Sequence, residues 1–254
     1  TLFPYTTLFR SSASIISFLS ASASTHNSLI SNTDSTRSTQ WVDSVFAKLT
    51  LRERVAQLFM VAGYTNKDKA HTDELTNFVT KEGVGGIIFF QGGPVRQVNL
   101  TNKLQQSAKV PLLISMDAEW GPGMRLDSTF SYPRQMMLGA INDNSLIYQM
   151  GADIARQLKR LGVHVNFAPV IDINSNPQNP VINTRAFGEN REQTVEKGLA
   201  YMAGMQDNGV LACAKHFPGH GDTDADSHYT LPLVNHSKQR LDSIELYPFK
   251  KLID

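Results

Sequence analysis

Hydrophobic and polar positions from residue 41 onward alternate between two patterns. In some segments an apolar residue recurs every three or four positions, which is typical of helices. Between these segments lie short continuous apolar runs, which are typical of strands covered on both faces of a parallel sheet. The predicted strands are residues 58–63, 85–90, 110–119, 163–174 and 210–217. The predicted helices are residues 41–49, 72–83, 94–108, 144–162 and 191–209, with a short helix from 51 and another from 237.

The segment 144–162 carries the clearest helical pattern. Its apolar stripe consists of Leu146, Ile147, Met150, Ile154, Leu158 and Leu161. Gly162 follows the stripe and is predicted to end the helix, because glycine readily adopts the left-handed conformation found at helix ends. Strands that alternate with helices of this kind predict an α/β fold with a parallel sheet.

Two architectures fit this alternation: a doubly wound open sheet and a (β/α)8 TIM-type barrel. No Gly-x-Gly-x-x-Gly motif opens a helix, so dinucleotide binding lacks its main signal. Asp117, Asp172, Lys215 and His216 instead stand at the carboxyl ends of predicted strands, where barrel enzymes hold their reactive side chains. We therefore predict the barrel. Because a closed barrel has eight strands, we expect the chain to be truncated after about five strand–helix units.

The composition excludes several classes of protein. The formal net charge is +1 at pH 7, so bulk electrostatics gives no reason to expect a nucleic-acid partner. No run of about 18 apolar residues occurs, so no membrane span is predicted. Cys213 is the single cysteine, which excludes a framework of intrachain disulfides.

The first 40 residues differ from the rest of the chain. Residues 1–11 match the translation of a common sequencing-library adapter, and we interpret them as an artefact outside the fold. Residues 12–40 are rich in serine and threonine and have no periodic apolar face. We interpret them as a disordered tail or the remnant of a signal peptide.

The segment KHFPGHGDTDADSHYTLP, residues 215–232, holds a dense group of titratable side chains. His216 and His220 are four positions apart, as in zinc-binding helices, but the proline and glycines around them prevent a helix. The three aspartates that follow resemble the start of a calcium loop. However, Ser227 and Leu233 occupy the positions at which such a loop requires glycine and glutamate. We therefore predict no metal site.

Within this segment, Asp226 precedes His228 by two positions. In a loop, the carboxylate can accept a hydrogen bond from one ring nitrogen while the other nitrogen faces a substrate. Because histidine titrates near neutral pH, such a pair can donate a proton and recover it. We expect the neighbouring glycines to let the loop move. The same residues fit equally well a solvated loop whose side chains form local turns.

Four stretches together resemble glycoside hydrolase family 3, in its bacterial exo-β-N-acetylglucosaminidase branch. Residues 215–232 are very similar to the family signature, and DAEWGPGMRL resembles the family's Asp-x-Glu-Gly-Gly-x-x-x-Arg segment. FAPVIDIN resembles the end of its fourth strand, and NTRAFGEN resembles its Arg-x-Phe-Gly loop. We therefore interpret residues 41–254 as part of the family's N-terminal barrel domain. With the signal-peptide interpretation, this resemblance favours a periplasmic or exported protein over a cytoplasmic one.

The resemblance implies a retaining hydrolase that removes terminal, non-reducing β-linked N-acetylglucosamine from glycans such as peptidoglycan fragments. His228 would be the general acid/base, oriented by Asp226. No metal or organic cofactor is implied, and the expected partner is the carbohydrate substrate. The residues implied to bind the sugar are Asp117, Arg125, Arg185, Lys215 and His216.

The sequence departs from the family pattern at Trp120 and Pro122, which stand where the family has glycine and a variable residue. This change affects the wall of the sugar pocket, so the substrate preference stays open. The family's nucleophile is an aspartate after a late barrel strand, which the resemblance places beyond Asp254. The 254-residue chain is therefore expected to be inactive alone. A family 3 β-glucosidase and a non-catalytic glycan-binding module are the alternatives.

Overall fold

A computed structural model of the chain describes residues 32–253. The chain separates into two compact units, Thr1–Leu51 and Arg52–Asp254. The predicted adapter artefact and most of the predicted tail or signal peptide lie outside the described residues.

The described part of the first unit is mainly one helix, α1 (Asn32–Lys48). It begins at Asn32 rather than at residue 41, within the segment predicted to be a tail. Three of its apolar residues, Trp41, Val42 and Phe46, are about half exposed.

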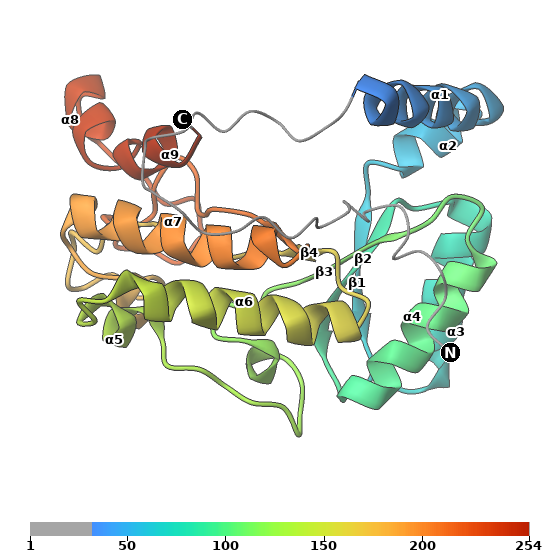
Figure 1. Cartoon of the computed structure of the whole chain (residues 1–254), viewed down its shortest axis with the longest axis horizontal. Coiled ribbons are helices and arrows are strands. Elements are labelled where there is room, and N and C mark those ends of the chain that lie inside the picture. The colour runs from blue at the N-terminus through green and yellow to red at the C-terminus, as the bar shows by residue number, and fades with distance from the viewer. Residues whose placement is uncertain (1–31, 254) are drawn as a thin grey trace, which may run out of the picture. The chain divides into compact units, whose positions relative to one another are not determined.

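The second unit contains one sheet of five parallel strands in the order β1-β2-β3-β4-β5 (Figure 1). The strands are β1 (Met60–Tyr64), β2 (Gly86–Gln91), β3 (Leu113–Met116), β4 (Val165–Asn166) and β5 (Leu211–Ala212). Each strand pairs with the next one along the chain. An unreversed order of this kind is that of a (β/α)8 barrel, whereas the order reverses in a doubly wound sheet. The predicted α/β class and the predicted choice of barrel are confirmed.

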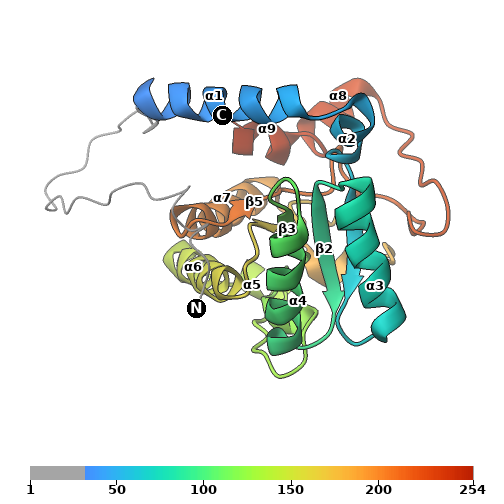
Figure 2. The same ribbon diagram turned by 90° about the vertical axis from the view of Figure 1, so that its right-hand side faces the viewer.

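Helices occupy the connections between strands, as parallel pairing requires. In order, the helical elements are α2 (Leu51–Ala56), α3 (Lys69–Asn77), the π-helix η2 (Phe78–Glu82), α4 (Pro94–Ser107), the 3-10 helix η3 (Pro122–Met124), α5 (Gln135–Gly139), α6 (Asn144–Arg160), the 3-10 helix η4 (Asn183–Arg185), α7 (Arg191–Asp207), α8 (Lys238–Ser243) and α9 (Tyr247–Ile253). Helices α3 and α4 lie side by side, and so do α6 and α7 (Figures 1 and 2). The side chains of Asp143 and Asn190 cap the N-termini of α6 and α7.

Alternate strand residues face the helices and form the core. Ile87 and Phe89 of β2 are fully buried, as are Ile114 and Met116 of β3. They pack in one cluster with α3, α4, α6 and α7. Because parallel strands in register point paired residues to the same side, the other residues of these strands face away from the helices.

The opposite face of the sheet is less covered. Leu113 of β3 and Leu211 of β5 are 43% and 55% exposed. In a closed barrel this face would be the packed interior. Its exposure in the described residues agrees with part of a barrel rather than a closed one.

Helix α6 follows its predicted stripe with one exception. Ile147, Ile154 and Leu158 are buried, whereas Leu146 is 50% exposed. Gly162 has a φ of +74°, so the predicted glycine stop is confirmed.

Strands β4 and β5 are shorter than the predicted runs 163–174 and 210–217. Pro169 has no backbone N–H and interrupts a regular ladder. Parallel pairing nevertheless continues beyond it, because Lys215 N donates to the Pro169 carbonyl and Ile171 N donates to the Lys215 carbonyl. This extension carries the chain directly into the predicted site.

The segment from residue 237 forms two short helices, α8 and α9, rather than the single predicted helix. Among the described residues, no helix combines the length and the apolar character needed to cross a membrane. The prediction of no membrane span therefore holds for this part of the chain.

Candidate functional site

Polar side chains from four segments meet beyond the carboxyl ends of the strands. Asp117 and Glu119 follow β3, Lys215 follows β5, and Arg125 and Arg185 lie in the loops at η3 and η4. We call these five residues the ion-pair cluster. It includes four of the five residues predicted to bind the sugar.

Lys215 bridges the two carboxylates of the cluster. Its Nζ lies 2.7 Å from Asp117 Oδ1 and 2.8 Å from Glu119 Oε1. On the other side of Asp117, Arg125 Nη2 lies 3.2 Å from Oδ2. Asp117 is therefore held between two cations, and its side chain is 17% exposed. A partly exposed carboxylate held in this way can accept hydrogen bonds from sugar hydroxyls.

Glu119 is the most buried member of the cluster, with its side chain 1% exposed. Arg185 binds it through two hydrogen bonds, Nη2 to Oε1 at 2.7 Å and Nε to Oε2 at 3.0 Å. Burial alone would raise the pKa of Glu119. The hydrogen bond from Arg185 and the charges of Lys215 and Arg185 outweigh burial and hold this pKa at about 2.

Glu119 was not among the predicted site residues, although a signal for it exists in the sequence. It lies two positions after Asp117, and residues at this spacing in an extended chain point to the same side. The structure bears this out, because both carboxylates contact the same Lys215 ammonium.

His216 is joined to the ion-pair cluster and to a second buried carboxylate, Asp172. Its Nδ1 lies 2.6 Å from Asp172 Oδ2, and its Nε2 lies 3.1 Å from Nη2 of Arg185. Because a guanidinium can only donate, Nε2 accepts and Nδ1 carries the proton that binds Asp172. Asp172 thus orients the predicted sugar-binding imidazole. The sequence placed Asp172 at a strand end but predicted no role for it.

Two glycines of this segment allow close packing. Gly219 has a φ of +134°, a conformation that side chains disfavour. A Cβ at Gly221 would lie 1.7 Å from the carbonyl oxygen of Ile173. Backbone conformation at Gly219 and close contact at Gly221 therefore require these glycines, a different reason from the predicted loop movement.

The predicted acid/base pair is in contact. His228 Nδ1 lies 2.6 Å from Asp226 Oδ1, and the backbone N–H of His228 donates to the same oxygen. Both hydrogen bonds lower the pKa of Asp226, and the one from the backbone has the larger effect. The His228 side chain is 75% exposed, so its Nε2 is open to a ligand. Within the described residues, no hydrogen bond or ion pair joins this pair directly to the ion-pair cluster.

Trp120 and Pro122, the two departures from the family pattern, lie next to the ion-pair cluster in the chain. Pro122 begins η3. The guanidinium of Arg134 lies 4.3 Å from the centre of the Trp120 ring and also donates to Thr184, the neighbour of Arg185. The tryptophan thus forms part of a contact between the loops that carry Glu119 and Arg185.

A second group of side chains has the composition of a metal site. Atoms of Asp222, His236 and Glu245 lie within 4.8 Å of one another. Arg240 already contacts two of them, with nitrogens 2.7 Å from Glu245 Oε1 and 3.7 Å from Asp222 Oδ2. A cation bound there would be repelled by this guanidinium. We therefore interpret the group as an ion-pair network.

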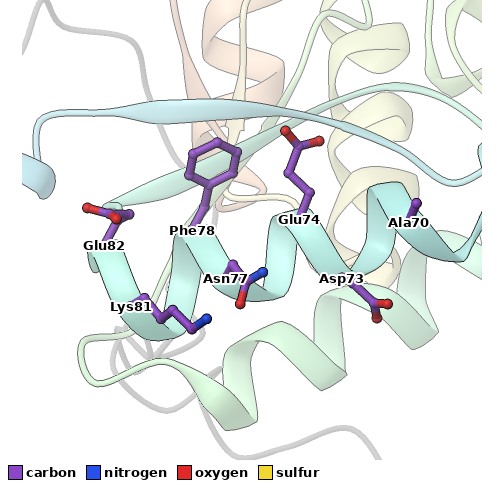
Figure 3. A pocket seen from close by; sticks show the side chains of 7 residues that line it. All are labelled: Ala70, Asp73, Glu74, Asn77, Phe78, Lys81 and Glu82. Carbon is purple, nitrogen blue, oxygen red and sulfur yellow. The ribbon is translucent and has the colours of Figure 1, made fainter.

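An open hollow on the surface of α3 and η2 is a further concave feature (Figure 3). Its lining, which includes Asp73, Phe78 and Lys81, comes from α3 and η2 alone and contains no predicted site residue. Side chains from one helical segment do not bring together the ends of several strands. The candidate site is therefore the ion-pair cluster with the 215–228 segment.

Comparison with known proteins identifies the fold family. The family model described as "Glycosyl hydrolase family 3 N terminal domain" matches residues 50–254. The chain belongs to glycosyl hydrolase family 3. The resemblance expected from the sequence motifs is thereby confirmed.

Two similar proteins have related names. β-Hexosaminidase A of Pseudoalteromonas piscicida is 37% identical over 193 residues, which cover 71% of this chain and 32% of that protein. A protein of Cellulomonas fimi named β-N-acetylglucosaminidase/β-glucosidase is 32% identical over 188 residues, which cover 74% of this chain and 33% of that protein. The chain thus spans about a third of the length of these two relatives.

A solved structure of a family 3 β-N-acetylglucosaminidase from Paenibacillus sp. str. FPU-7 is also similar. It has a TM-score of 0.74 and 42% sequence identity, over 81% of this chain and 40% of that chain. This similarity supports the assignment of the five strands to part of the family 3 barrel.

Proposed function

We propose that the full-length protein removes terminal, non-reducing β-linked N-acetylglucosamine from glycans such as peptidoglycan fragments. The observation that carries the proposal is the pairing of Asp226 with His228 in the same segment that supplies Lys215 to the ion-pair cluster and places His216 against its Arg185. One segment thus carries the predicted proton-transfer pair together with two of the predicted sugar-binding residues. The names of the relatives at 37% and 42% identity support the same activity.

In the proposed mechanism, the five predicted sugar-binding residues hold the terminal sugar. Asp117 accepts hydrogen bonds from its hydroxyls, and Arg125, Arg185, Lys215 and His216 complete the pocket. Buried polar groups left without partners by a wrong sugar would provide the selectivity.

His228 acts in both chemical steps of the proposed retaining mechanism. Its Nε2–H first protonates the leaving glycosidic oxygen, while a carboxylate attacks the anomeric carbon to form a glycosyl-enzyme. The neutral imidazole then removes a proton from water, which hydrolyses that intermediate. Asp226 holds the proton of Nδ1 throughout and stabilises the imidazolium form.

The nucleophile is proposed to be an aspartate beyond Asp254, on a later strand of the barrel. The carboxylates of the described site are already engaged: Asp117 and Glu119 with cations, and Asp172 with His216. The inactivity of the 254-residue chain alone therefore stays a prediction. No metal or organic cofactor enters this mechanism. A periplasmic or exported location is likewise proposed.

The substrate preference distinguishes this proposal from a β-glucosidase, an activity included in the name of the Cellulomonas fimi relative. We expect the full-length protein to hydrolyse 4-nitrophenyl β-N-acetylglucosaminide with a kcat/KM at least about 100-fold above that for the β-glucoside, because polar groups that bind the acetamide would lack partners. Release of 4-nitrophenol from both substrates measures this ratio. Preference for the glucoside would contradict the proposal, and binding without hydrolysis would indicate a glycan-binding module.

A further inference from the structure

His220 lies near the middle of the segment that joins the ion-pair cluster to the proposed acid/base pair. It is 8% exposed, and both of its ring nitrogens have hydroxyl partners. Nδ1 lies 2.5 Å from Thr223 Oγ1, and Nε2 lies 3.3 Å from Ser227 Oγ. Burial lowers the pKa of His220, and the nearby charge of Asp172 only partly opposes this. The ring is therefore neutral at neutral pH, with one donor and one acceptor nitrogen.

Hydroxyl groups contact both ring nitrogens of His220. The Thr223 hydroxyl lies 2.5 Å from Nδ1 and 3.0 Å from the His220 carbonyl, and it accepts from the amide of Asn179. A hydroxyl can either donate to a ring nitrogen or accept from it, so the contacts with Thr223 and Ser227 are compatible with either neutral tautomer.

The backbone of His220 is attached to the buried part of the site. Its N–H donates to Asp172 Oδ1 at 2.7 Å, while the other oxygen of Asp172 binds the ring of His216. Its carbonyl accepts from Asn179 Nδ2 at 2.7 Å. Asn179 is itself buried. His220 is thus held by the same carboxylate that orients a predicted sugar-binding residue.

At its other end, His220 reaches the proposed acid/base pair through Ser227, which lies between Asp226 and His228 in the chain. Apolar packing contributes little to holding this loop, since Tyr229 and Leu231 are 89% and 82% exposed. Polar contacts must therefore set its position, and the bond between Ser227 and His220 comes closest to the pair.

We propose that His220 is a positioning residue: through Asp172 at one end and Ser227 at the other, it holds His228 where its imidazole can reach the glycosidic oxygen of the bound sugar. This inference rests on the proposed function, because it assigns His220 to the proton-transfer step. It predicts a defect confined to that step. Sugar binding by the ion-pair cluster should be unaffected.

Leaving groups of different acidity separate proton transfer from binding. An aryl glycoside of phenol needs a proton on the departing oxygen, whereas the acidic 2,4-dinitrophenol departs without one. In the full-length protein, His220→Asn is expected to lower kcat/KM about 10- to 100-fold for the phenyl substrate, because a displacement of the order of 1 Å is enough for such a loss. The dinitrophenyl substrate should change by less than about 3-fold, since it does not use the acid.

Three controls accompany this measurement. Ser227→Ala removes the hydrogen bond to His220 while leaving the buried ring in place. This variant should show the same dependence on the leaving group, to a smaller extent. His164→Asn removes another partly buried imidazole, one that accepts from the backbone of Ile114, and should leave both rates unchanged. The inhibition constant of N-acetylglucosamine should stay the same in all these variants.

Equal losses for both leaving groups in His220→Asn, or a matching loss of N-acetylglucosamine affinity, would overturn the inference and assign His220 to the sugar pocket. Unchanged rates in both His220→Asn and Ser227→Ala would also overturn it. His228→Ala, assayed in parallel, separates the two proposals. If it shows no dependence on the leaving group, the acid/base assignment fails together with the inference; if it does, only the positioning role of His220 is at stake.

Discussion

Replacement of His228 by alanine in the full-length protein is expected to lower kcat/KM for phenyl β-N-acetylglucosaminide by about 10²- to 10⁴-fold, the usual contribution of a general acid. The structure provides the reason. Nδ1 of His228 is bound to Asp226, which leaves an exposed Nε2 as the group that transfers the proton. With the 2,4-dinitrophenyl substrate, the first step should be nearly unaffected.

The second step of the same variant offers an independent readout. Without His228, water is no longer activated, so the glycosyl-enzyme should accumulate with the dinitrophenyl substrate. Azide needs no base, and it should restore turnover and give a glycosyl azide. His236→Ala is the matched control, since His236 is another histidine paired with an aspartate, Asp222. If that control loses as much activity as His228→Ala, or if azide has no effect, the acid/base role of His228 is wrong.

Replacement of Glu119 by glutamine is expected to destabilise the full-length protein by about 3–5 kcal/mol, the usual cost of removing one partner from a buried ion pair. Two cations, Lys215 and Arg185, would lose their shared carboxylate. Because both are predicted to bind the sugar, the affinity for N-acetylglucosamine should fall as well. Urea unfolding and inhibition by N-acetylglucosamine measure the two effects. Glu82→Gln, which removes an exposed pair with Arg52, should cost no more than about 1 kcal/mol.

The lowered pKa of Glu119 should also make the free energy of unfolding depend on pH. Its pKa is about 2 in the folded state and 4.5 in the reference state, so ionisation contributes about 3 kcal/mol of stability above pH 4.5. Because the folded pKa is the lower one, this contribution is lost as pH falls from 4.5 toward 2. The difference in unfolding free energy between wild type and Glu119→Gln should therefore shrink over this range. A constant difference would contradict the charged, buried state of Glu119.

Local patterns were sufficient to predict the main elements of the fold. The apolar stripe of α6 and its Gly162 stop lie where the sequence placed them, because both depend on residues close together in the chain. The lengths of β4 and β5 were not predictable in the same way, since Pro169 interrupts a ladder whose partner lies more than 40 residues away. The extent of α1 was also missed, because the serine- and threonine-rich segment that begins it has no apolar face.

Four of the five members of the ion-pair cluster were among the predicted site residues, but the contacts between them were not predictable from the sequence. Motif resemblance indicated Asp117, Arg185 and Lys215 but not Glu119, the buried carboxylate that joins Lys215 to Arg185. His220 was considered only as a metal ligand, because its hydroxyl partners become neighbours only when the loop folds. The cis peptide between Lys215 and His216 could not have been expected either, since cis bonds that do not precede proline are rare.

The stereochemistry of the first product tests the proposed retaining mechanism. In the proposed retaining mechanism, His228 of the full-length protein is the acid/base and an aspartate on a later strand is the nucleophile. Proton NMR during hydrolysis of 4-nitrophenyl β-N-acetylglucosaminide should show the β anomer of N-acetylglucosamine first, followed by slow conversion to the equilibrium mixture. Initial release of the α anomer, or no release of N-acetylglucosamine at all, would contradict the account.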